Sequence, residues 1–264
     1  MVLLYTMNLD DIVFNKRQEV AALKLTFDLD KTLKAIAKLP KPHDFKKALK
    51  RKKLALIAEV KKASPSAGVI REDFNPVALA KEYEAAGAAA ISVLTDQKYF
   101  QGKLEYLKDI RKKAALPLLR KDFIVDEVQI YEARLAGADA VLLIVRILTD
   151  EELKRFLALA KTLHLQALVE VHDLAEAQRA MNAGAEIVGI NNRDLDALTV
   201  NLQITYYLLK TLPQLKNLVV VSESGIKSGV ETAKLHAAGV DAVLVGESLL
   251  VSSEIKTKAK ELIG

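Results

Sequence analysis

An acid and a base stand two positions apart at the end of an apolar run. Glu59 and Lys61 close the run that begins at Leu56, and the segment continues into Ser64. Because side chains alternate along a strand, the two charged groups leave the same face. Ions at the end of a buried strand cost free energy unless they are paired or solvated, and active sites are where this cost is accepted. The spacing therefore indicates acid–base chemistry.

Polar side chains follow five further apolar runs in the same way. These residues are Lys121, Glu170, Asn191 with Arg193, Glu223 with Ser224 and Gly225, and Glu247 after Gly246. Lysines and glutamates that share a pocket shift one another's protonation, which makes them useful as acids or bases near neutral pH. A structural network of ion pairs is the alternative interpretation.

Strand-like runs alternate with helical patterns after residue 50. The strands are centred near residues 57, 91, 118, 142, 168, 188, 220 and 244, and a helical pattern follows each one. Short apolar strands that alternate with helices are typical of parallel βα units. Eight such units predict an α/β protein with a closed (β/α)8 TIM barrel over residues 51–264, which forms a single catalytic domain.

Four of the predicted helices end at a glycine that follows an alanine. These glycines are Gly87, Gly137, Gly184 and Gly239, and they recur at intervals of roughly two βα units. Glycine at this place is typical of a left-handed helix C-cap. A barrel built from repeated pairs of βα units would have this pattern.

The first fifty residues have a different pattern. Helical spacing over residues 10–25 and 30–38 is followed by Pro40 and Pro42, which cannot continue a helix. We expect residues 1–50 to form an N-terminal helical extension packed across one end of the barrel. Its expected role is structural cover and not chemistry.

The carboxyl ends of all strands meet at one rim in such a barrel, and active sites of this fold are built there. The polar residues named above are therefore expected in one pocket. Gly225 and Gly246 follow the seventh and eighth strands, where backbone amides commonly hold phosphate in these barrels. Two positive groups and a phosphate site predict a doubly anionic small molecule as the substrate.

Composition argues against several other classes of protein. The chain has 264 residues, a hydrophobic fraction of 51% and no cysteine, so disulfides and thiolate metal sites are excluded. Its four histidines are far apart in the sequence, and no metal site is expected. The net charge of +5 comes from lysines mixed with glutamates on helical faces, so we expect no nucleic-acid partner. No signal peptide or membrane-spanning run is evident, and a cytoplasmic protein without a membrane partner is expected.

Several motifs together resemble the indole-3-glycerol phosphate synthase family of tryptophan biosynthesis. The most specific are Glu59-x-Lys61-x-x-Ser64-Pro65-Ser66 and Arg120-Lys121-Asp122-Phe123, which other phosphate-binding barrels do not share. Matching segments also occupy residues 11–17, 92–102, 189–195 and 222–226, so the resemblance covers nearly the whole chain.

The resemblance implies ring closure of 1-(2-carboxyphenylamino)-1-deoxyribulose 5-phosphate, with loss of carbon dioxide and water. No cofactor or metal is expected, and a monomer is expected. Lys121 would be the general acid that protonates the ribulose carbonyl oxygen while the aromatic carbon attacks. Glu170 would be the base in the later dehydration, and Glu59 would orient or share these protons.

The resemblance also implies binding roles for the other residues. Lys61 would hold anionic groups of the substrate, above all the phosphate, together with backbone amides of Gly225, Gly246 and Glu247. The anthranilate carboxylate would be received by Ser64, Asn191 and Arg193. Glu223 and Ser224 would complete the pocket. Its apolar wall would consist of Phe100, Phe123 and Leu142.

Two segments depart from the family pattern. Ala67 stands where relatives often have a basic residue or glycine, and residues 250–252 replace a stretch that usually brings an arginine. Weaker phosphate affinity or altered loop behaviour is the expected consequence. The residues alone do not separate an indole ring closure from an aldose isomerisation, and an anion-binding barrel without turnover is a further alternative.

Overall fold

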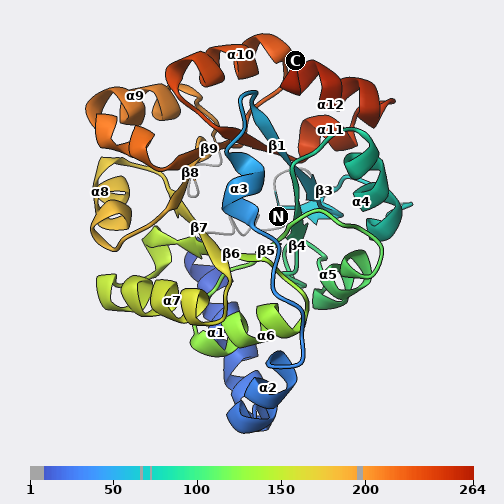
Figure 1. The fold of residues 1–264 in the computed structure, drawn as a ribbon, viewed down its shortest axis with the longest axis vertical. Helices are drawn as coiled ribbons and strands as arrows, with labels where there is room; N and C mark the ends of the chain where they lie inside the picture. The colour runs from blue at the N-terminus through green and yellow to red at the C-terminus, as the bar shows by residue number, and fades with distance from the viewer. Residues whose placement is uncertain (1–8, 66–67, 72, 195–198) are drawn as a thin grey trace, which may run out of the picture.

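Eight parallel strands close into a barrel (Figure 1). The computed structural model of the chain describes residues 9–65, 68–71, 73–194 and 199–264; Ser66, Ala67 and Leu195 of the motifs above lie outside them. The strand order around this barrel is β1, β10, β9, β8, β7, β6, β5 and β4, and every pairing is parallel. The strands are β1 (Ala55–Val60), β4 (Ala90–Leu94), β5 (Leu118–Lys121), β6 (Ala140–Ile144), β7 (Gln166–Val171), β8 (Ile187–Asn191), β9 (Val219–Glu223) and β10 (Ala242–Val245).

Helices surround the barrel and connect its strands, which confirms the predicted (β/α)8 fold. They are α4 (Pro76–Ala85), α5 (Leu104–Arg111), α6 (Glu127–Leu135), α7 (Asp150–Thr162), α8 (Leu174–Asn182), α9 (Gln203–Thr211), α10 (Gly229–Ala238), α11 (Glu247–Leu250) and α12 (Ile255–Ile263). Two short 3₁₀ helices, η1 (Val145–Ile147) and η2 (Pro213–Asn217), lie between them. The glycine after each of α4, α6, α8 and α10 has a positive φ, as the Ala-Gly pattern predicted. No described helix is long and apolar enough to cross a membrane.

The alternation of side chains along each strand creates two hydrophobic layers. On β1, Leu56, Ala58 and Val60 pack outward against the helices. Ala55 and Ile57 point into the barrel, where they pack with residues of the other strands. Glu59 continues this inward series, so the period of two that buries the core also directs its carboxylate toward the barrel axis.

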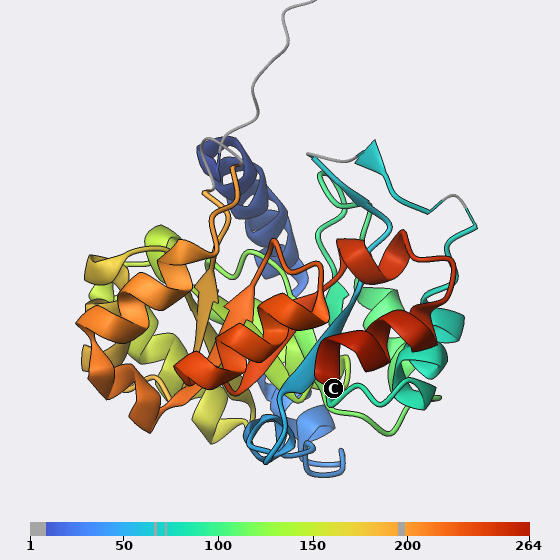
Figure 2. The same cartoon turned by 90° about the horizontal axis from the view of Figure 1, so that it is seen from above.

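The N-terminal extension differs from the prediction. Three helices form it: α1 (Leu9–Thr26), α2 (Leu29–Ile36) and α3 (Phe45–Leu49). They do not pack across one end; α1 and α3 lie at opposite ends of the barrel (Figure 2), and α2 packs on α6. The short α3 was not predicted, and its fully buried Phe45 and Leu49 close the barrel interior where the strands begin.

A two-stranded hairpin after β1 was also not predicted. It consists of β2 (Ala63–Ser64) and β3 (Gly68–Val69), which pair antiparallel outside the barrel. Its first strand keeps Ser64 buried close to the end of β1. The hairpin therefore places a predicted substrate-binding residue at the rim.

Candidate active site

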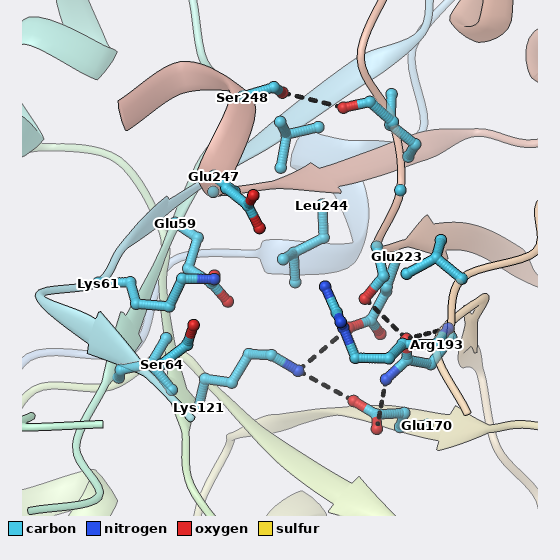
Figure 3. Close-up of a pocket in the computed structure, with 18 of the residues that line it drawn as sticks. Glu59, Lys61, Ser64, Lys121, Glu170, Arg193, Glu223, Leu244, Glu247 and Ser248 are labelled. Atoms are coloured by element: carbon cyan, nitrogen blue, oxygen red, sulfur yellow. Dashed lines mark hydrogen bonds and ion pairs between the residues drawn. The ribbon is translucent and has the colours of Figure 1, made fainter. Parts of the chain in front are cut away.

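A cavity of about 1020 Å³ opens where the strands end. Every residue that the sequence placed in the site lines it. They come from β1 and its hairpin, from the loop after β4, from β5 to β10, and from the loops that follow these strands (Figure 3). The residues are Glu59, Lys61, Ser64, Phe100, Lys121, Phe123, Leu142, Glu170, Asn191, Arg193, Glu223, Ser224, Gly225, Gly246 and Glu247.

Lys121 forms the centre of the site. It is the last residue of β5, and its Nζ lies 2.9 Å from Glu170 Oε2 and 3.1 Å from Glu223 Oε2 (Figure 3). Burial works to lower the pKa of Lys121, but the carboxylates of Glu170, Glu223 and Glu59 more than offset it. The net effect raises this pKa, so the lysine carries its proton at neutral pH.

The two carboxylates around Lys121 have different proton affinities. Burial works to raise the pKa of Glu170, but Lys121 and His172 outweigh it and lower this pKa. Burial raises the pKa of Glu223, and the nearby carboxylates of Glu170 and Glu59 raise it further. Lys121 works to lower it, and the resulting pKa is about 7. Divergent pKa values in neighbouring acids allow one to serve as a base while the other holds a proton.

A second ion pair stands on the opposite side of the site. Lys61 Nζ lies 2.9 Å from Glu59 Oε2, and both side chains are largely buried. This is the pair that the spacing of two residues predicted on one strand face. Lys61 and Lys121 therefore both face Glu59, which places two cations and three carboxylates around one cavity.

Asn191 connects the carboxylate of Glu170 to the loop after β9. Its Nδ2 donates to Glu170 Oε1 at 3.1 Å, and its Oδ1 accepts from Ser224 Oγ at 2.8 Å. The backbone N–H of Arg193 also donates to Asn191 Oδ1, at 3.1 Å. Both ends of the amide are thus engaged, so Asn191 orients Glu170 as well as facing the cavity.

Apolar side chains cover the side of the cavity next to α1. The Phe100 and Phe123 rings have centroids 6.1 Å apart, and Leu142 lies below them inside the barrel. Leu9 and Ile12 of α1 also line the cavity. The extension thus contributes directly to the site, in contrast to its predicted role as a cover alone. An aromatic ring would find apolar contacts here.

The loops after β9 and β10 form the opposite end of the cavity. Gly225 has a φ of +78°, and a Cβ on Gly246 would overlap Glu59 Oε2. Ser248 Oγ donates to the backbone oxygen of Ile226 at 2.9 Å, which holds the two loops together (Figure 3). The departing segment at residues 250–252 also reaches the cavity, through Val251 and Ser252.

Three residues near the site were not selected from the sequence. His172 contacts Glu170, Lys16 pairs with the Asp122 next to Lys121, and Gly189 leaves the space that Glu223 occupies. His172 has a positional signal, because it stands two positions after Glu170 on the same face of the chain. Lys16 and Gly189 lie in segments that match the family pattern. Among the described residues, no group of three or more His, Asp or Glu side chains is arranged to hold a metal ion.

Comparisons with known proteins agree with this geometry. Residues 9–262 match the sequence profile of indole-3-glycerol phosphate synthase. The enzyme of that name from Roseiflexus castenholzii is 50% identical over 263 residues, which cover 97% of this chain and 98% of the relative. The one from Desulforamulus reducens is 46% identical, with 97% of each chain covered. Among solved structures, 3-hexulose-6-phosphate synthase from Salmonella typhimurium has a TM-score of 0.60 at 14% identity, over 79% of this chain and 96% of that one, and shares the fold. The chain belongs to the indole-3-glycerol phosphate synthase family.

Proposed function

We propose that this chain converts 1-(2-carboxyphenylamino)-1-deoxyribulose 5-phosphate to indole-3-glycerol phosphate in tryptophan biosynthesis, as a carboxy-lyase. Membership of the family supports the reaction. The arrangement that carries the mechanism is Lys121, which shares its ammonium group between Glu170 and Glu223 at one wall of the cavity.

Lys121 acts as the general acid in ring closure. The aromatic carbon that bears the carboxylate attacks the ribulose carbonyl carbon, and the carbonyl oxygen takes the proton from Lys121 Nζ. Loss of carbon dioxide then returns the bonding electrons to the ring. The raised pKa of Lys121 ensures that the proton is present, and general acid catalysis of this kind contributes about 10²- to 10⁴-fold.

Glu170 acts as the base in the dehydration that follows. Its lowered pKa keeps it ionised, so it takes the proton that the new ring loses from the carbon beside the nitrogen. The hydroxyl leaves as water with a proton from Glu223, whose pKa is about 7. Glu59 lies near enough to Lys121 to raise its pKa, so it orients or shares these protons. Lys61 supports the same chemistry from the other side of Glu59.

The substrate is held at both of its anionic ends. We assign the phosphate to Lys61 and to the backbone amides of Gly225, Gly246 and Glu247, which line the cavity after β9 and β10. The anthranilate carboxylate is assigned to the other polar rim of the cavity, and its ring to the apolar wall. The carboxylate-binding residues are Ser64, Asn191 and Arg193; Glu223 and Ser224 complete the pocket, and Phe100, Phe123 and Leu142 form the wall.

One chain supplies all of these groups. This supports a monomer in which residues 1–50 and the barrel of residues 51–264 form one catalytic unit. We expect this monomer to be cytoplasmic and to act on a small molecule without a nucleic-acid partner, metal or cofactor. Size-exclusion chromatography with light scattering should give the mass of a single chain, 29.0 kDa.

The direct test is indole fluorescence after the protein is mixed with the carboxyphenylamino-deoxyribulose phosphate. We expect an indole signal that the Lys121→Ala variant loses by about 10³-fold or more. A signal that survives in Lys121→Ala would retain the function and reject Lys121 as the acid. Absence of product from the unaltered protein, with tight binding in calorimetry, would identify an anion-binding barrel instead.

A further inference from the structure

His172 lies against Glu170 and against Glu176 of α8, and it is not among the residues that line the cavity. It directly follows β7, two positions after Glu170, so both side chains leave the same face of the chain. Its imidazole is 8% exposed. A histidine buried this deeply needs partners for both ring nitrogens, and its surroundings provide two carboxylates.

The two ring nitrogens of His172 face different glutamates. Nδ1 lies 2.9 Å from Glu176 Oε2, which also accepts the backbone N–H of His172 at 2.8 Å. Nε2 lies 3.3 Å from Glu170 Oε1 without the alignment of a hydrogen bond. Glu176 is itself fixed, because its backbone N–H donates to Asp173 Oδ1 at the start of α8. The three side chains form a row from α8 to the active site.

Other charged and polar groups near Glu176, His172 and Glu170 belong to the elements that pack on β7 and α8. Lys121 of β5 holds Glu170 Oε2, and Asn191 of β8 donates to Glu170 Oε1. The 3₁₀ helix η1, which contacts both β7 and α8, contributes the exposed Arg146. Burial works to lower the pKa of His172, but Glu170 and Glu176 outweigh it and raise this pKa to about 10. At neutral pH the ring is therefore an imidazolium.

We propose that His172, held between Glu176 and Glu170, is a positioning residue that fixes Glu170 Oε1 so that only Oε2 is presented to Lys121 and the substrate. The inference rests on the role proposed above for Glu170. Asn191 donates a hydrogen bond to Oε1 and the imidazolium of His172 forms an ion pair with it, while Oε2 is left for proton transfer.

A second consequence follows from the order of the proton transfers. Once Lys121 has given its proton to the substrate, the ammonium beside Glu170 becomes a neutral amine. A buried carboxylate without a cation takes up a proton readily, which would remove the base before dehydration. The charge on His172 remains beside Glu170 throughout the cycle and keeps the carboxylate ionised.

The test compares His172→Gln with the control His236→Gln, which replaces a histidine on α10 that contacts the backbone oxygen of Val240. We expect kcat of His172→Gln to fall about tenfold to a hundredfold, with KM changed less than about threefold. The acid limb of its kcat profile should move to higher pH, because Glu170 loses a cation. His236→Gln should match the parent in both respects.

A fall in kcat without a shift of the acid limb would reduce His172 to a structural residue and overturn the proposal. An unchanged kcat would also overturn it. Because KM and the pH profile are measured in the same experiment, an effect on substrate binding is distinguished from an effect on kcat.

A measurement independent of activity separates this proposal from the function of Glu170. Nitrogen-15 NMR of histidine-labelled protein should show His172 as an imidazolium at pH 8, and Glu176→Gln should shift its titration toward the ordinary value of 6.5. A neutral His172 ring at pH 8 would overturn the proposal. Full activity in Glu170→Gln, with the imidazolium still observed, would reject the proposed base and leave the histidine's charge state established.

Discussion

Two neighbouring residues at the end of β5 belong to two different ionic clusters. Lys121 points into the cavity, toward Glu170 and Glu223. Asp122 points the other way, because consecutive side chains alternate at the end of a strand, and pairs with Arg120 at 3.1 Å and Lys16 at 3.0 Å. The two clusters lie in one rim and use the same kinds of side chain, so their differences show what makes ions reactive.

The cluster around Asp122 is sealed, because the side chains of Lys16, Asp96 and Asp122 are almost fully buried. Lys16 of α1 reaches Asp96 at 3.0 Å and Glu19 at 2.7 Å in addition to Asp122. Thr95 Oγ1 donates to Asp122 Oδ2 at 2.5 Å. Burial works to raise the pKa of Asp122, but Arg120 and Lys16 outweigh it and lower this pKa. The charges of this cluster are fixed, and they hold α1 on the barrel.

The cluster around Lys121 is open to the cavity. Three carboxylates face Lys121 and Lys61, and Glu223 Oε1 is buried without a hydrogen bond. Glu223 therefore has a pKa near neutrality, in contrast to Asp122, although both are fully buried. A proton can move at low cost where the pKa of a buried carboxylate lies near neutrality, and this is the property that acid–base chemistry requires.

The largest expected effect is on stability and separates the two lysines. Lys16→Met should lower the free energy of unfolding by about 3–5 kcal/mol, because it leaves Asp96 and Asp122 buried without their cation. Lys121→Met should lose less than half as much, since Glu223 already has a pKa near 7 and can neutralise itself by taking a proton. Urea unfolding at pH 7 measures both.

The exposed Lys112 on the surface provides the control for these variants. Lys112→Met removes a pair with Asp109 in which both side chains are more than half exposed, and should change stability by less than about 1 kcal/mol. Equal losses for Lys16→Met and Lys121→Met would contradict the distinction between a sealed and an open cluster.

The sequence predicted the open cluster better than the sealed one. Lys121, Glu170 and Glu223 were found because each follows an apolar run, and the barrel brings all strand ends to one rim. Lys16 and Asp122 are far apart along the chain, and their pairing depends on where α1 packs. No local pattern contains that information.

The same limit explains the errors in the extension. Helix α3 has five residues and follows two prolines, so it is too short for a period of 3.6 to be recognised. Its role depends on Phe45 and Leu49 fitting into the open end of the barrel, which is a property of the assembled strands. Local signals predicted the elements, while packing decided how the extension is distributed over the barrel.

A smaller effect is expected at Gly189, in the middle of β8. A Cβ at this position would overlap Glu223 Oε1, so Gly189→Ala should push this carboxylate away from Lys121. We expect kcat to fall about tenfold to a hundredfold, because misplacement of a catalytic group by about 1 Å has effects of this size. The sealed cluster does not contact Gly189, and stability should change much less than in Lys16→Met.

A double-mutant cycle with Glu223→Asp tests the reason for this loss. The shorter aspartate withdraws from the space that the new methyl group occupies, so Gly189→Ala should cost less activity in the Glu223→Asp background than alone. Additive losses would mean that Gly189 acts on the strand and not through Glu223.

The smallest expected effect is a difference in the pH dependence of stability. The pKa of Glu223 is raised from 4.5 to about 7, so the folded protein retains a proton that the unfolded chain has released. The contribution of Glu223 to stability is therefore full below pH 4.5 and is lost as the pH rises through 7. The Glu223→Gln variant has no carboxyl group to titrate at this position. Its free energy of unfolding should therefore increase relative to that of the parent between pH 4.5 and 7.

Asp122→Asn should show the opposite sign. The pKa of Asp122 is lowered below 3.8, so its stabilising contribution is present above that pH and is lost only as the pH falls further. Asp122→Asn should thus be less stable than the parent throughout the range in which Glu223→Gln gains. Urea unfolding at pH 4.5, 6 and 8 compares them. A Glu223→Gln difference that stayed constant between pH 4.5 and 8, or an Asp122→Asn difference that changed over this range, would mean that the carboxylate does not titrate as its cluster requires. The contrast between the sealed and the open cluster would then not account for where the chemistry occurs.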